Sequence, residues 1–103
     1  MTTTDQILDA VHHATGARPD EITADCRIAR VAIARFLAMR LYSETHPWSS
    51  NLDAALAVKK RDPGTGRHGL MRAEYLLEHD EDFRKAHAVA REKLGLEHAG
   101  KNC

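Results

Sequence analysis

Residues 26–45, CRIARVAIARFLAMRLYSET, predict one long helix that is apolar on most of its sides. Its large apolar residues are Ile28, Val31, Ile33, Phe36, Leu37, Met39 and Leu41. A helix that is apolar all round is usually buried by its neighbours, so we expect this helix to be central, with the other elements around it. It should end at His46, because the residue before Pro47 resists helical geometry.

Two shorter helices are predicted on the N-terminal side of this segment. The stretch TDQILDAVHHATG carries apolar residues at helical spacing, with Thr4 as its N-cap and Gly16 as the left-handed residue after its end. In the following ARPDEITAD, Pro19 suits the first position of a short helix, and Ile22 is the expected buried anchor.

The C-terminal half of the chain predicts a short helix, a turn and a long helix. Ser49 or Ser50 is the expected cap of the short helix NLDAALAV. The stretch KKRDPGTGRHG is rich in glycine and charge and predicts a turn or a tight loop. A long helix then runs from about His68 to Leu94, and Asp80 is a candidate cap where the stretch HDEDF would divide it.

No stretch alternates between apolar and polar residues as a strand would, so the sequence predicts an all-α fold of five or six helices. We expect one small helical domain over residues 1–96 and a disordered tail over residues 97–103. At 103 residues, the chain is too short for a nucleotide-driven motor or a large catalytic barrel.

Charges are balanced in number but not along the chain. Fifteen Lys and Arg residues match fifteen Asp and Glu residues, which argues against a uniformly basic nucleic-acid binder. The net charge is −4 over residues 1–26, +6 over residues 27–72 and −2 over residues 73–103. The basic middle of the chain is therefore a candidate anion-binding face.

The sequence carries no set of residues typical of an enzyme, a cofactor site or a metal site. The seven histidines are not spaced as metal ligands, the two cysteines are far apart, and a phosphate-binding loop motif is missing. We therefore expect no catalytic residues, no cofactor and no metal. The polar, acidic start and the lack of a long apolar run favour a cytoplasmic protein without membrane contact.

Trp48 is the only tryptophan of the chain and follows the proline that ends the central helix. In that position, we expect its side chain to close the core between two helices. The alternative is a stacking platform on which a nucleic-acid base rests.

The short helix, the turn and the second helix between residues 49 and 79 are typical of a helix-turn-helix. In such a unit, the second helix enters the major groove of DNA and its first residues reach base edges. Four cations lie near the start of that helix: Lys59, Lys60, Arg61 and Arg67. The spacing alone equally fits a helical hairpin whose charged turn is simply solvated.

The stretch VKKRDPGTGRHGLMRAEYLLEHDEDF, residues 58–83, resembles the signature region of the C-terminal DNA-binding domain of the bacterial replication initiator DnaA. Upstream, ITADCRIARVAIARFLAMRLYSET and ILDAVHHATGARPDEI are similar to that domain's earlier helices. The resemblance is colinear over about residues 5–94. It implies a DnaA-type helix-turn-helix that binds double-stranded DNA selectively in replication or transcription control, associated with the nucleoid.

The resemblance also implies roles for individual residues. Asp62 matches an aspartate at the start of the recognition helix that accepts a hydrogen bond from a base, and Arg27 matches an arginine that reaches the minor groove. Arg35 and Arg72 match basic positions on the phosphate side. The full expected DNA-binding set is Arg27, Arg35, Lys59, Lys60, Arg61, Asp62, Thr65, Arg67, His68 and Arg72.

Several positions depart from the DnaA pattern. Asp25, Cys26 and Ala29 occupy places where the family's basic loop is positive or polar. Three further departures motivate an alternative function. Pro63 and Gly64 stand where the family has a histidine and a threonine, and Gly66 stands where it has an apolar residue. The alternative is an adaptor or inhibitor, phage-borne for example, that kept the fold and lost recognition of the DnaA box. Its partner would be a replication or regulatory protein.

Overall fold

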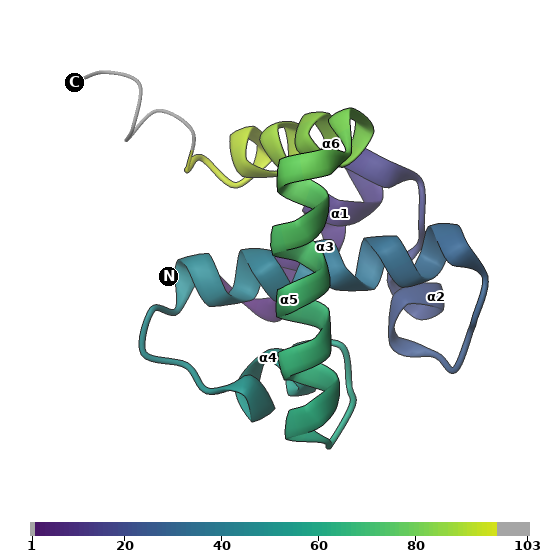
Figure 1. The fold of residues 1–103 in the computed structure, drawn as a ribbon. Helices are drawn as coiled ribbons and strands as arrows, with labels where there is room; N and C mark the ends of the chain where they lie inside the picture. Colours follow the sequence, from purple (N-terminus) through teal and green to yellow (C-terminus); the bar gives the residue numbers. More distant parts are fainter. Residues whose placement is uncertain (1, 97–103) are drawn as a thin grey trace.

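Residues 2–96 are described by the computed structural model, and among them six helices form and no strand (Figure 1). The helices are α1 (Thr4–Thr15), α2 (Pro19–Thr23), α3 (Ala29–Thr45), α4 (Asn51–Ala57), α5 (Pro63–His79) and α6 (Glu81–Lys93). The predicted all-α fold of five or six helices is confirmed. No helix within residues 2–96 is long and apolar enough to cross a membrane. The tail expected over residues 97–103 lies outside the described residues.

Helix α3 is the central helix, as predicted, and contacts each of the other five helices. Figure 1 shows it running across the middle of the molecule, with α5 crossing in front. The predicted start at Cys26 is wrong, because α3 begins at Ala29 and the side chain of Ile28, expected in the core, is 57% exposed. The reason lies in Arg35, whose guanidinium binds the carbonyls of Ile22, Ala24 and Cys26 and so holds this stretch as a loop.

The helix ends follow local capping chemistry, largely as predicted. Gly16 adopts the left-handed conformation after α1, with φ of 83°. Ser50 caps α4 by accepting a hydrogen bond from the N–H of Asp53, and Asp80 divides the C-terminal segment into α5 and α6. The cap of α1 is Thr3 rather than Thr4, because Gln6 pairs reciprocally with Thr3 in a capping box.

The predicted turn over KKRDPGTGRHG is wrong for most of its length. Helix α5 begins at Pro63, so the connection from α4 covers only residues 58–62. Pro63 occupies the first helical turn, where its missing N–H costs no hydrogen bond, and Asp62 caps the helix. The glycines that suggested a loop lie within the helix.

Two of these glycines let α5 lie close to its neighbours. A Cβ at Gly66 would lie 1.8 Å from the backbone oxygen of Asn51 in α4. A Cβ at Gly69 would lie 2.1 Å from Cε of Met39 in α3. Both glycines are buried on the same face of α5 as Ala73 and Leu76. The missing side chains are therefore what allows close packing at these crossings.

Trp48 was expected to close the core between two helices, and this prediction is wrong. Its side chain is 94% exposed in the loop between α3 and α4. The aromatic contact at this corner comes from Tyr42, whose ring stacks on His46 with centroids 4.1 Å apart. The Tyr42–His46 stack forms at the C-terminal end of α3 and does not involve Trp48.

Glu44 ties α6 to α3 through a largely buried polar network. Its side chain is 17% exposed and its carboxylate lies 2.7 Å from Nε of Arg40 and 2.9 Å from Nε2 of His87, with Arg91 as a third partner. Burial acts to raise the pKa of Glu44, but the hydrogen bonds from His87, Arg40 and Arg91 outweigh it and lower the pKa to about 2.

The Glu44 network predicts a loss of stability in acid. Because the native pKa of about 2 lies below the ordinary 4.5, the stabilisation is complete above about pH 4.5 and is lost as the pH falls towards 2. At pH 7, Glu44→Gln should lower the free energy of unfolding by about 3 kcal/mol, measured by urea denaturation. The matched Glu74→Gln, at an exposed position of α5, should change it by less than about 0.5 kcal/mol. A gap between wild type and Glu44→Gln that stays constant down to pH 2.5 would contradict this assignment.

The packing of α5 predicts opposite outcomes for two glycine substitutions. Gly66→Ala should destabilise the protein by about 2 kcal/mol or more, because the added methyl group meets the backbone of Asn51. Gly64→Ala places its methyl group no closer than 3.4 Å to the Asp62 side chain and should be neutral or stabilising by up to about 1 kcal/mol through helix propensity. Thermal unfolding of both variants checks the pair, and equal melting temperatures would refute the close approach.

Candidate nucleic-acid interface

The connection between α4 and α5 is a compact turn that carries three consecutive cations. The N–H groups of Val58 and Lys60 both donate to the carbonyl of Ala55, and Lys59 adopts a left-handed backbone with φ of 62°. Lys59, Lys60 and Arg61 therefore lie immediately before the N-terminus of α5. Their charges add to the positive end of the helix dipole.

Asp62 and Thr65 serve the start of α5. The carboxylate of Asp62 accepts hydrogen bonds from the N–H of Gly64 at 3.2 Å and from the hydroxyl of Thr65 at 3.1 Å. The side chains of Asp62 and Thr65, both expected to contact DNA, are thus hydrogen-bonded to each other. Their contact with bases stays a prediction, and in the structure they act as a helix cap.

The outer face of α5 carries a ridge of exposed cations and apolar groups. Arg67, His68, Met71, Arg72 and Tyr75 follow one another at helical spacing and are all exposed. The guanidinium carbon of Arg72 lies 5.1 Å from the centroid of the Tyr75 ring, a cation–π contact. The ring of His68 meets Phe36 edge-on at 5.7 Å. This outer ridge lies on the side of α5 opposite the buried glycines.

A shallow hollow lies within the outer ridge. It has a volume of about 310 Å³ and is lined by Gly64, Arg67, His68 and Met71. Because Gly64 has no side chain, the first turn of α5 exposes its backbone at one end of the hollow. The hollow therefore combines cationic, imidazole and thioether groups around open space.

The loop of residues 24–28 is held by two cations, Arg35 of α3 and Lys60 of the turn. Arg35 donates to the carbonyls of Ile22, Ala24 and Cys26 at 2.8, 2.9 and 3.2 Å. Lys60 donates to the Asp25 carboxylate at 2.8 Å and to the carbonyl of Ala24 at 3.1 Å. The contacts of Lys60 therefore join two segments that are 35 residues apart in the sequence.

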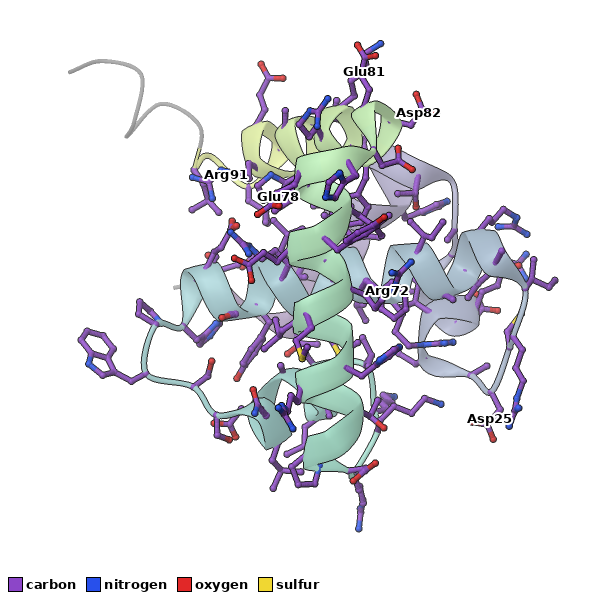
Figure 2. All side chains as sticks on the ribbon, viewed as in Figure 1. Asp25, Arg72, Glu78, Glu81, Asp82 and Arg91 are labelled. Carbon is purple, nitrogen blue, oxygen red and sulfur yellow. The ribbon has the colours of Figure 1, made fainter. Side chains whose placement is uncertain are left out.

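Asp25 lies within the field of several cations. The hydrogen bond from Lys60 lowers the pKa of Asp25, and the charges of Lys60, Arg27 and Arg35 lower it further. Figure 2 shows Asp25 on the same side of α5 as Arg72. The exposed Arg27 belongs to the same loop as Asp25, and its charge acts on the Asp25 carboxylate.

The structure brings most of the predicted DNA-binding residues together, in three settings. Lys59, Lys60 and Arg61 lie in the turn before α5, and Arg27 lies in the loop that Lys60 contacts. Those of the outer ridge follow along α5: Arg67, His68 and Arg72. Asp62 and Thr65 form the cap, and Arg35 is engaged with backbone carbonyls.

Sequence reasoning missed Tyr75 as a member of this surface and did not predict that Asp25 pairs with Lys60. A four-residue spacing from Met71 places Tyr75 on the outer ridge, so its exposure could have been found from helical periodicity. No local pattern links Asp25 to Lys60, since the two lie in different elements.

Comparison with known proteins identifies no relative of this chain. No protein-family model matches it, and neither a curated protein nor a solved structure does. The resemblance to the C-terminal domain of DnaA therefore stays a prediction from the sequence, and the all-helical architecture rests on the structure itself.

Proposed function

We propose that α4, the turn and α5 act as a helix-turn-helix that binds double-stranded DNA. The observation that carries the proposal is the Lys60 contact, because it joins the loop bearing Arg27 to the turn that precedes α5. Exposed cations thereby lie on two distant segments that are joined next to the N-terminus of this helix. In this arrangement α5 would enter the major groove while Arg27 approaches the neighbouring minor groove.

The proposal assigns different tasks to the side chains of this surface. Arg67 and His68 would face base edges, where an arginine can make a bidentate contact with guanine. Met71 beside them suits the methyl group of thymine. Lys59, Arg61 and Arg72 would contact phosphates, which fix the position of the domain without reading sequence.

Arg35 acts as a positioning residue in this proposal. Its hydrogen bonds to three backbone carbonyls shape the loop that carries Arg27. With so few cations left for phosphate, binding should weaken with salt at a log-log slope of about −3 to −6. Such a protein would associate with the nucleoid, in replication or transcription control, and would need no cofactor and no catalytic group.

Substitutions in the turn and the outer ridge test the proposal. Arg61→Ala and Arg72→Ala should each weaken binding to duplexes of any sequence by about 3–10-fold and reduce the salt slope by about 1, because each removes one phosphate contact. The measurement is fluorescence anisotropy with a labelled mixed-sequence duplex from 50 to 300 mM NaCl. Lys85→Ala, which removes an exposed cation from α6, is the matched control and should change affinity by less than about twofold. Absence of duplex binding at tens of micromolar protein in 50 mM NaCl would refute the proposal.

The exposure of Trp48 favours a second candidate function, a protein-binding adaptor. The indole is 94% exposed beside a hollow of about 320 Å³ lined by Tyr42, His46, Pro47 and Asp53, among others. Exposed tryptophans next to hollows are typical anchors of protein interfaces. A partner that wild type retains from nuclease-treated extract and Trp48→Ala loses, together with no affinity for duplex DNA, would favour the adaptor function over DNA binding.

A further inference from the structure

The ion pair between Asp25 and Lys60 is unequal in its exposure. The Asp25 side chain is 98% exposed, whereas the Lys60 side chain is 22% exposed. The ammonium group of Lys60 is therefore drawn against the loop, where it also reaches the carbonyl of Ala24 at 3.1 Å. The carboxylate is open to solvent on its other sides.

The surroundings of the Asp25 carboxylate are those that suit a phosphate. Lys60 donates to it at 2.8 Å, and the charges of Arg27 and Arg35 also act on it. A carboxylate oxygen and a phosphate oxygen accept the same charge-assisted hydrogen bonds from an ammonium group. Within residues 2–96, Asp25 is the acidic side chain that is hydrogen-bonded to a cation of the turn.

We propose that Asp25 holds Lys60 in the place of a DNA phosphate and so limits the affinity of this surface for duplex DNA. The inference rests on the proposed function. On binding, Lys60 keeps its hydrogen bond to the carbonyl of Ala24, which holds the loop to the turn, and exchanges the Asp25 carboxylate for a backbone phosphate. Asp25 is then left facing the polyanion. Both the lost ion pair and the repulsion act against binding, so non-specific contact with phosphate is weakened most.

The exchange predicts a gain of affinity when the carboxylate is neutralised. Asp25→Asn should bind a fluorescein-labelled 20-base-pair duplex of mixed sequence about 5–20-fold more tightly at 50 mM NaCl. Its salt slope should be steeper by about 1, because Lys60 is then free to replace one counterion on the duplex. The gain should shrink to below about twofold at 300 mM NaCl, since the charges are exposed to screening.

A double-mutant cycle separates the exchange from simple repulsion. Lys60→Ala should weaken wild-type binding by less than about threefold, because Asp25 already occupies this lysine. In the Asp25→Asn background, the same substitution should remove most of the gain. If the gain survives without Lys60, Asp25 acts through repulsion alone and the exchange is refuted.

Two controls keep the result specific to this ion pair. Asp82→Asn makes the same change in net charge on α6, away from Asp25 in Figure 2, and should alter affinity by less than about twofold. The melting temperature of Asp25→Asn should stay within about 2 °C of wild type, because the Asp25 side chain is exposed and Lys60 keeps its hydrogen bond to the carbonyl of Ala24.

The outcomes distinguish this inference from the proposed function. If wild type binds the duplex and Asp25→Asn binds it equally well, the exchange is overturned and the proposed function stands. If neither protein binds at tens of micromolar in 50 mM NaCl, the proposed function fails and the exchange fails with it.

Discussion

The close packing of α5 on α4 and α3 is the constraint on which the candidate interface depends. A methyl group at Gly66 would meet the backbone of Asn51 in α4, and one at Gly69 would meet the end of the Met39 side chain of α3. The buried residues of α5 are Gly66, Gly69, Ala73 and Leu76, and its charged side chains lie on the exposed faces. The glycines lower the intrinsic helix propensity of this segment, so the helix relies on its contacts with α4 and α3 and on the Asp62 cap.

The cations of the basic segment divide into those that build the surface and those that remain open on it. Arg35 donates its hydrogen bonds to three backbone carbonyl groups, and Lys60 donates to the carbonyl of Ala24 and the carboxylate of Asp25. These contacts fix the loop beside the turn. A count of positive residues therefore overstates the charge that this surface presents to an approaching anion, and the arrangement of the remaining cations matters more than their number.

Capping and periodicity were enough to predict most of the fold, because both act within a few residues of sequence. Ser50 and Asp80 mark helix starts through bonds to N–H groups three residues away. The glycines of residues 64–69 predict a loop because glycine has a low helix propensity. Contacts of Gly66 with α4 and of Gly69 with α3 outweigh this low propensity. The Asp25–Lys60 pair could not be predicted from the sequence, because 35 residues separate its members and no periodic spacing relates them.

The neutral total charge conceals a polarity along α5. Cations of the turn lie before its N-terminus, whereas Glu78, Glu81 and Asp82 lie around its C-terminus and the start of α6 (Figure 2). The helix dipole has the same direction, positive at the first turn and negative at the last. Any polyanion that approaches α5 is therefore attracted at one end and repelled at the other. A domain with no net charge gains little long-range attraction, but this polarity restricts the orientations in which it can meet a charged partner.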